Sequence, residues 1–493
     1  MNSGISPTVV PCPNFEERVM TISAQDQANA PQATRLLAEY VVNLRYDELP
    51  LEVIAAAKTA LIDWVAVASV GSRTTRQGAS SAAVARAEEA KPEATLFNDG
   101  SMTSATWAAF ANGAASHSIE LDDIHLPSIV HGGVAMVGAA VAVAQKLRID
   151  GKRLIEALVA GFDVQYRIGE AIAASHYEKF HSTGTVGTFG AAAACAKLMN
   201  LSVEQTQWAL GNAGSQAAGL WQYLKKGDDT KVLHPGKSCM NGVMAATLAS
   251  HGFNGSLDVI EGERGFVATL SDEVDWNRIT DRLGSYFKVI ENGYKLHACC
   301  RHGHVTIDQT LRLANENNLT ADNVKRVVVK LPTNSVLTID DANPASAYKA
   351  KFSAHFMVAN AIIHRRVGLE AFTEERLADP AIRALMQKVE VVEEKKFNDG
   401  FPDKWTAEVE VETLDGGRVS GTADMPQGEW VNPLPPSRIE EKARDLLALI
   451  VPQSDAAALV SRLRSLETIA DTRLMLPEIE RMGPVSVHCV AAE

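Results

Sequence analysis

Four segments of the chain concentrate side chains that can move protons or hold anions. The first runs from Glu120 to His125, carries three carboxylates and one imidazole, and is followed by His131 and two glycines. Carboxylates and imidazoles this close together are costly to bury unless they pair. The segment is therefore either a solvated loop with helix caps or a functional site. The pair Gly132-Gly133, which permits a close backbone approach, favours the site.

A second segment, from Lys179 to Thr188, combines His181 with hydroxyl side chains and glycines. It stands directly before an alanine-rich run. Its hydroxyl groups, Thr185 among them, and the N–H groups of a following helix could together hold an anion. The alternative is an ordinary Ser/Thr cap at the start of a helix, and the sequence favours neither interpretation over the other.

A third segment, from Thr230 to Ser238, contains Lys231, His234 and Lys237. Its Gly-Lys-Ser end is similar to a phosphate-binding loop. That motif requires a glycine where Lys231 stands, however, and no strand precedes it, so we exclude a nucleotide loop. Two lysines and a histidine within so short a segment suit a carboxylate ligand, although a lysine is more often simply solvated.

The fourth segment, from Tyr294 to His304, includes Lys295, His297, Cys299 and Cys300. Adjacent cysteines fit poorly with the spacing of structural zinc sites, and an iron–sulfur cluster needs several separated thiolates. The chain contains neither G-x-S-x-G nor G-x-G-x-x-G, which removes the main signals of α/β hydrolases and dinucleotide enzymes. We expect no metal and no organic cofactor.

Helices must position these segments, because residues 30 to about 270 contain one apolar helical run after another. The first clear run follows a proline and ends before a glycine, which are a start and a stop signal. Small residues in these runs let helix backbones approach closely, so we predict an all-helical domain over residues 1–290. Helices are expected over Leu51–Ser69, Ala105–Ala115, Val134–Lys146 and Leu154–Ala174, with a capping box at Ser202 and Gln205 before another.

The pattern changes near residue 290, where strand-like segments appear. Val324–Leu331 is rich in β-branched residues, and Thr406–Thr413 alternates strictly before a Gly-Gly turn and Arg418–Ser420. Between them, Ser353–His364 and Glu374–Val389 are predicted to be helices. Residues 291–436 are therefore expected to form a smaller α+β domain.

Residues 437–493 return to a helical, Ala/Leu-rich composition after the prolines at 433–436. Ser437 and Glu440 form the pattern of a capping box that opens a helix. We expect this segment to pack back on the N-terminal half. The α+β domain is then an insertion, and the fold class is mainly α. A cleft between two domains is a usual place for a ligand site.

The composition limits the partners that we expect. A net charge of −13 offers no basic surplus for nucleic acid, and an anionic substrate would need locally clustered Lys, Arg and His. The six cysteines form no C-x-x-C pair, and the first 26 residues resemble neither a signal nor a transit peptide. No apolar run reaches ~18 residues. We expect a soluble, cytoplasmic protein with a frayed N-terminus and no membrane partner.

Taken in order, four motifs resemble those of the MmgE/PrpD family, which includes 2-methylcitrate dehydratase, cis-aconitate decarboxylase and iminodisuccinate epimerase. The motifs are Glu120–His125, His181–Gly187, Lys295–Arg301 and Lys351–Ser353, and the resemblance extends over residues 30 to 485. It implies a helical domain built from both ends of the chain with an inserted α+β lid. It also implies a pocket between them, a homodimer, and a small anionic substrate handled without metal or organic cofactor.

The resemblance also assigns residues. His131 and His181 match the family's motif histidines, Lys231 and Lys295 its pocket lysines, and Asp123 an acidic position. Glu120 stands where several relatives carry Asp. Three positions depart from the family pattern. Ile124 stands where many members have Thr, and His297 replaces the usual Tyr, Phe or Pro. Phe356 stands where a Tyr is common. The residues that we expect to contact substrate are Glu120, Ile124, His125, Thr185, His297, Cys300 and Phe356.

The shared chemical problem of such enzymes is charge that develops on carbon next to a carboxylate. Lys231 and Lys295 would stabilise that charge, and an imidazole would move the proton. We expect His131 to be the main acid/base, His181 to position or protonate, and Asp123 to orient a partner. A lyase, either dehydratase or decarboxylase, is the leading hypothesis. An epimerase or isomerase, a non-catalytic polycarboxylate-binding protein, and a metal-dependent hydrolyase using the His297–His304 segment remain alternatives.

Overall fold

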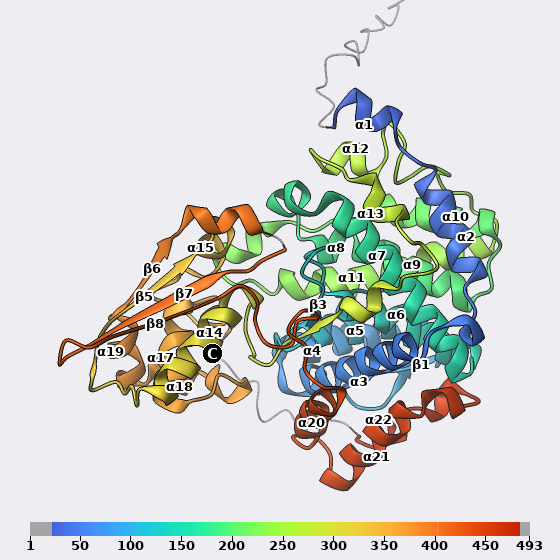
Figure 1. Cartoon of the computed structure of the whole chain (residues 1–493). Helices are drawn as coiled ribbons and strands as arrows, with labels where there is room; N and C mark the ends of the chain where they lie inside the picture. The colour runs from blue at the N-terminus through green and yellow to red at the C-terminus, as the bar shows by residue number, and fades with distance from the viewer. Residues whose placement is uncertain (1–21, 402, 484–493) are drawn as a thin grey trace, which may run out of the picture.

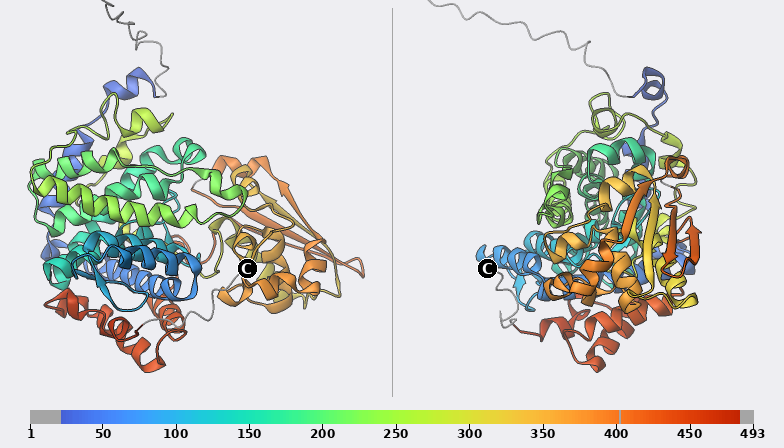
Figure 2. Two further views of the ribbon diagram at one scale, coloured as in Figure 1. Left: turned by 180° about the vertical axis from the view of Figure 1, so that it is seen from behind. Right: turned by 90° about the vertical axis from the view of Figure 1, so that its left-hand side faces the viewer.

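The computed structural model describes residues 22–401 and 403–483, which form a large helical body and a smaller lobe that contains a sheet (Figure 1). We call residues 304–423 of this lobe the lid. Figure 2 shows the same two parts from behind and from the side. The predicted frayed N-terminus lies outside the described residues. The mainly helical fold with an inserted α+β lobe is confirmed.

The core of the body is a set of long, closely packed helices, and each predicted helix extends beyond its expected bounds. Small residues bring their backbones together as expected. At the crossing of two of these helices, a Cβ on Gly161 would lie 3.0 Å from the carbonyl oxygen of Gly190. The long helices are α3 (Leu51–Thr74), α5 (Ala105–His117), α6 (Gly132–Leu147), α7 (Gly151–Lys179), α9 (Gly187–Leu198) and α11 (Thr230–Ser250).

Shorter elements complete the body. The predicted capping box is confirmed, because the side chains of Ser202 and Gln205 each bond the other's backbone at the start of α10 (Val203–Gly214). The predicted all-helical character of this domain is not exact, because a two-stranded hairpin, β1 (Ala94–Thr95) with β2 (Met102–Thr103), and a short strand at residues 123–124 interrupt the helices. The other short helices are α1 (Ala24–Ala28), α2 (Ala33–Asn43), α4 (Arg76–Ala87), α8 (Ser182–Thr185), α12 (Phe266–Leu270) and α13 (Trp276–Thr280).

Helix α3 is long and apolar enough to cross a membrane by length and composition, alone among the helices of the described residues. In the structure, 78% of its apolar window is buried. It packs against α5 and against the C-terminal helix α20 (Pro436–Leu447). Its apolar character is therefore that of a core helix.

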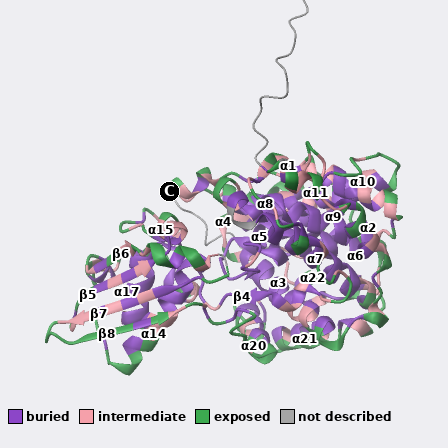
Figure 3. Ribbon diagram, turned by 45° about the horizontal axis from the view of Figure 1, so that its top comes forward, coloured by how far each residue is buried: buried purple, intermediate pink, exposed green. Residues whose placement is uncertain are grey.

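The lid holds a four-stranded sheet in the order β6-β5-β7-β8. The predicted strand β5 (Val324–Leu331) and the hairpin of β7 (Ala407–Thr413) with β8 (Arg418–Ala423) are confirmed. Helices α14 (His304–Glu316) and α17 (Ala354–His364) cover one face of the sheet, and Figure 3 shows more exposed residues on the edge strand β8. Two short helices, α15 (Thr333–Ile339) and α16 (Ala347–Ala350), lie between β5 and α17.

The prediction over Glu374–Val389 is confirmed as helical up to Met386 but is wrong in its continuity and at its end. The structure has α18 (Glu374–Ala378), then α19 (Pro380–Met386), then strand β6 (Val389–Glu393). Pro380 lacks an N–H group and starts a new helix, which Asp379 caps through the N–H of Ala381. The β-branched valines that follow run parallel to β5, with Val389 opposite Val327.

The C-terminal segment returns to the body, where α20 and α21 (Gln453–Arg464) pack on α3 (Figure 1). The predicted capping box at Ser437 is wrong. Helix α20 begins at Pro436, directly after Pro435, and has no side-chain cap. A proline in the first turn supplies the start signal instead, because its fixed backbone angle suits that position. The last helix is α22 (Pro477–Glu480).

Body and lid are joined beside the first chemical segment. Strand β3 (Asp123–Ile124) pairs antiparallel with β4 (Gly293–Tyr294), so that Asp123 lies opposite Tyr294. The fourth segment therefore leaves the body alongside the first and brings Lys295 close to the loop between α5 and α6.

Candidate active site

The loop Glu120–His125 is enclosed by the body, so the alternative of a solvated loop is wrong. Glu120 and Asp122 are fully buried, and Asp123 is 4% exposed. Glu120 also has a backbone φ of 58°, in the left-handed region that non-glycine residues seldom adopt. The surrounding structure thus holds a strained turn that directs its carboxylate inward.

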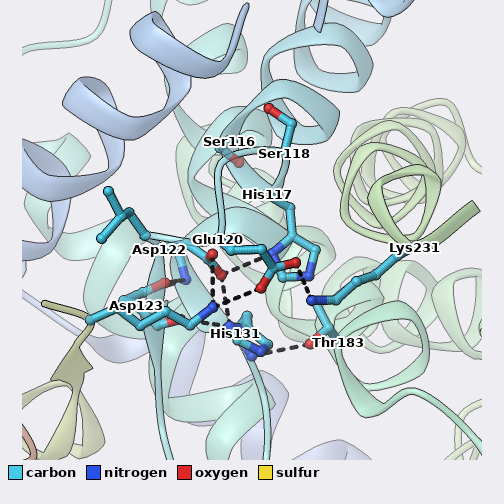
Figure 4. A network of polar contacts seen from close by, with 12 residues as sticks. Ser116, His117, Ser118, Glu120, Asp122, Asp123, His131, Thr183 and Lys231 are labelled. Carbon is cyan, nitrogen blue, oxygen red and sulfur yellow. Dashed lines mark hydrogen bonds and ion pairs between the residues drawn. The ribbon is translucent and has the colours of Figure 1, made fainter. Parts of the chain in front are cut away.

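Two ammonium groups neutralise the buried carboxylates. Lys231, in the first turn of α11, contacts Oε1 of Glu120 (Figure 4). Lys295 Nζ lies 3.1 Å from Oε2 of the same carboxylate and 3.2 Å from Oδ1 of Asp122. Burial alone would raise the pKa of Glu120, but Lys231 and Lys295 hold it well below its usual range. The two lysines predicted from sequence therefore meet at one carboxylate.

The imidazole of His131 is oriented through Nδ1. This atom lies 2.7 Å from Oδ2 of Asp122 and 2.9 Å from the backbone oxygen of Asp123. Two acceptors at Nδ1 keep the proton there, which leaves the Nε2 lone pair free. Burial lowers the pKa of His131 to about 4, although Asp122 acts in the opposite direction. At neutral pH His131 is thus a neutral base.

His181 lies in the same cluster, with its ring centre 6.4 Å from that of His131. Its Nδ1 is 2.9 Å from Nδ1 of His234, so one ring donates and the other accepts. Burial first, and the neighbouring charges next, hold the pKa of His181 well below its usual range, and burial lowers the pKa of His234 to about 4. The aromatic ring of Trp221 covers His181 at 5.1 Å between ring centres.

The carboxylate of Asp123 faces away from the imidazoles. Both of its oxygens accept the N–H of Gly133 at 2.9 Å, and Oδ2 accepts the Asn292 amide at 2.8 Å. Burial raises the pKa of Asp123 to about 7 against the effect of the Asn292 hydrogen bond. Its side chain therefore secures the start of α6. The carboxylate that orients His131 belongs to Asp122.

Three expected substrate contacts have other partners in the structure. His125 Nε2 lies 3.0 Å from Glu291, and its ring stacks on Tyr166 at 4.1 Å. Thr185 Oγ1 bonds His176 Nε2 at 2.7 Å. Ile124 packs in a small apolar cluster with Leu126, Ile129 and Trp405.

The remaining three expected substrate contacts, which lie on or in the lobe, are His297, Cys300 and Phe356. His297 bonds Asp308 at 2.9 Å and lines a cleft of about 890 Å³ between body and lid. Cys300 stays near the lysines, and burial raises the pKa of its thiol. Phe356 is fully buried and packs on Phe372, with ring centres 5.6 Å apart, so it belongs to the apolar core of the lid.

Besides Asp122, His117 and Lys351 belong to the cluster and were assigned no role from sequence. His117, the last residue of α5, bonds Asp122 through Nδ1 at 2.9 Å. Lys351 donates to the backbone oxygens of Ile119 at 2.8 Å and Ala298 at 3.1 Å, and thereby ties the site loop to the lobe. Lys351 is the first residue of the motif Lys351–Ser353, so the sequence did contain a signal for it. His117 ends an alanine-rich helix, and only its position three residues before Glu120 points to it.

Some of the possible metal-ligating side chains lie close together. Among the described residues, two groups have donor atoms within 4.8 Å of one another: His117 with His131 and His181, and His125 with Glu170 and Glu291. Lys288 Nζ already lies 2.8 Å from Glu170 in the second group, and the first stands beside two lysines. A cation is disfavoured next to such charges. The His297–His304 segment forms no such group among these residues.

The fold and the cluster together define a body-and-lid protein with a buried lysine, imidazole and carboxylate site suited to an anionic ligand. The chain belongs to the MmgE/PrpD family. The family model described as the MmgE/PrpD N-terminal domain matches residues 35–279, and the model of the C-terminal domain matches residues 297–467.

Its relatives carry the names of lyases. The chain is 27% identical to the cis-aconitate decarboxylase of Aspergillus terreus over 93% of this chain and 98% of that protein. It is 26% identical to the human cis-aconitate decarboxylase, over 78% and 81% respectively. The mitochondrial 2-methylcitrate dehydratase of Yarrowia lipolytica is 26% identical over 41% of this chain and 35% of its own length. These relatives support an enzyme of lyase type.

Proposed function

We propose that the protein is a lyase that removes CO₂ from a small unsaturated polycarboxylate, with cis-aconitate as the first candidate. One observation carries the proposal: Lys231 and Lys295 converge on the buried carboxylate of Glu120, and Lys295 shares Asp122 with the imidazole of His131. Relatives named cis-aconitate decarboxylases that align over 93% of the chain support the choice of substrate.

The reaction requires groups that stabilise a developing negative charge and a group that donates a proton. When the C–C bond to the leaving carboxylate breaks, CO₂ departs and the electron pair passes into the adjacent double bond. Negative charge then collects on the carboxylate at the far end of the conjugated system. A proton must add to the carbon next to that carboxylate, so each turnover consumes one proton.

Lys231 and Lys295 are placed to stabilise this charge. In the substrate-free site both are paired with Glu120, and the cluster of two lysines, Glu120 and Asp122 has no net charge. A substrate carboxylate would share or replace the contacts of Glu120. Fixed cations act strongly on developing charge in a site that excludes water, because they need no reorientation.

His131 is placed to supply the proton. Its Nδ1 is fixed by Asp122, and its Nε2 is free to face the substrate. An anionic substrate raises the pKa of a neighbouring imidazole above the value of about 4 that the substrate-free ring has. Substrate binding therefore brings a proton onto Nε2, which passes to carbon as CO₂ leaves.

The test is incubation in D₂O with cis-aconitate, 2-methylcitrate and iminodisuccinate, followed by NMR of the products. The expected result is loss of CO₂ from cis-aconitate with one deuterium bound to the carbon that gains the proton. Water loss from 2-methylcitrate alone would move the assignment to a dehydratase, and inversion of iminodisuccinate to an epimerase. Binding of all three acids without any turnover would contradict a lyase. The Lys295→Met variant serves as the inactive control in each incubation.

A further inference from the structure

His117 shares with His131 the carboxylate of Asp122. Oδ2 of Asp122 lies 2.9 Å from Nδ1 of His117 and 2.7 Å from Nδ1 of His131, while Oδ1 lies 3.2 Å from Lys295. In Figure 4 both rings turn their Nδ1 edge toward this carboxylate. One acidic side chain thus fixes two imidazoles in the same orientation.

The opposite edge of His117 is buried without a partner. The side chain is 0% exposed, and its Nε2 has no hydrogen-bond partner among the described residues. Buried polar atoms in native proteins are almost always bonded, because an unpaired one has lost its hydrogen bonds to water without replacement. An Nε2 held in this state is a position for a ligand atom.

The surroundings of this Nε2 identify the kind of ligand. Ring nitrogens of His117, His131 and His181 lie within 4.8 Å of one another, so one bound molecule can reach all three. The His117 and His181 rings are nearly parallel, with their centres 6.0 Å apart. His117 also acts electrostatically on Glu120, the carboxylate that both lysines contact. A ligand that reaches His131 and His181 is therefore also within reach of His117.

We infer that His117 contacts the substrate through Nε2 and shares one proton with a substrate carboxylate oxygen. The inference rests on the proposed function, because it takes an anionic substrate between Lys231 and Lys295. With Nδ1–H donated to Asp122, a neutral His117 offers only a lone pair at Nε2. An ionised carboxylate also offers only lone pairs. The contact therefore forms with one proton taken from water, bound either to Nε2 or to the carboxylate oxygen.

The charges that face this ring come from every side of the cluster. They include carboxylates, ammonium groups and other imidazoles. The facing groups are Glu120, Asp122, His131, His181, Lys231, His234 and Lys295.

His117→Asn separates this role from a structural one. The amide nitrogen of Asn takes the place of Nδ1 and keeps the bond to Asp122, whereas nothing replaces Nε2. The probe is tricarballylate, a saturated tricarboxylate that cannot lose CO₂ by this route. Calorimetry in buffers of different ionisation enthalpy then measures the number of protons taken up on binding. The matched control is His355→Gln, in the lid, whose Nε2 lies 2.9 Å from Asp340.

We expect wild type and His355→Gln to take up about one more proton per tricarballylate bound than His117→Asn does. We also expect tricarballylate to bind His117→Asn at least ten-fold more weakly at pH 6. Equal proton uptake and equal affinity in His117→Asn would overturn the inference. A crystal structure of the wild type with tricarballylate is the second measurement. The inference would also be overturned if, in that structure, Nε2 of His117 lay beyond hydrogen-bond distance of every carboxylate oxygen of the ligand.

Failure of the proposed function gives a different result. A wild-type enzyme that binds tricarballylate with the extra proton but turns over no acid of the panel would refute the lyase assignment. The contact of His117 with an anion would stand in that case.

Discussion

Oδ2 of Asp122 lies 2.7 Å from Nδ1 of His131, and this contact determines which edge of the imidazole faces the site. A carboxylate at Nδ1 holds the ring in one tautomer and stabilises the imidazolium that forms during proton transfer. Asp123, the neighbouring residue, offers only its backbone oxygen to the same nitrogen. The pair Asp122 and His131 is therefore the unit that the mechanism depends on.

The first prediction concerns this unit. Asp122→Asn should lower kcat about 10³-fold or more while changing KM little, because an amide can support the wrong tautomer of His131 and cannot stabilise its charge. Steady-state kinetics on the substrate found in the panel measure both constants. A decrease in kcat below ten-fold would show that the carboxylate does not assist His131.

The second prediction concerns the lysines. Lys231→Met should lower the free energy of unfolding by about 3–5 kcal/mol, because Glu120 would remain buried with one cation instead of two. Adding Glu120→Gln should restore most of this stability and none of the activity. Urea denaturation and kcat/KM together test the pair. Recovered activity in the double variant would mean that Lys231 serves only to neutralise Glu120.

The third prediction concerns pH. The pKa of Asp123 is about 7 in the folded protein, against an ordinary value of 3.8, so folding favours its protonated form. The stability that this preference contributes is complete below about pH 4 and is lost as the pH rises to about 7. The difference corresponds to at most about 4 kcal/mol.

Asp123→Asn removes this titration while its amide oxygen can still accept the N–H of Gly133. Urea denaturation of both proteins between pH 4 and pH 8 measures the effect. The wild type should lose stability relative to the variant across that range. Parallel pH profiles of the two proteins would show that Asp123 titrates near its ordinary value.

The fourth prediction concerns Phe356, a position expected from sequence to contact substrate. Because its ring lies in the core of the lid, Phe356→Ala should cost about 3–5 kcal/mol of unfolding free energy, and Phe356→Leu less than half of that. The Leu variant should keep the substrate preference of the wild type. Thermal unfolding and activity on the acid panel check both statements, and a changed preference in Phe356→Leu would place this residue in the pocket.

Local patterns in the sequence predicted several of the long helices and the β7–β8 hairpin. Apolar runs between start and stop signals located α3, α5, α6 and α7 correctly to within a few residues. Strand β6 was missed because it pairs with β5, more than 60 residues earlier, and its valines alone continue a helical pattern. A parallel partner so far away leaves no local signal.

The site was predictable in its residue types more than in its contacts. The resemblance to the family implied that Lys231, Lys295, His131 and Glu120 lie in one pocket. We expected Asp123 to orient a partner, whereas the carboxylate of Asp122 contacts His131. Neighbours in an extended segment point to opposite sides, and the direction depends on the pairing with Tyr294. His117 depended on the packing of α5, which no motif reveals.

The contact between Lys295 and Glu120, which lie 175 positions apart, also restricts how the protein can be made. A nascent chain that has emerged only as far as residue 290 contains the whole loop Glu120–His125 but lacks the second cation. Its two buried carboxylates would have Lys231 alone, so water would have to remain around them. The catalytic core therefore reaches its final form only after the ribosome has added the beginning of the lobe. Late synthesis of the lobe thereby delays maturation of a site that is built mostly from residues made earlier.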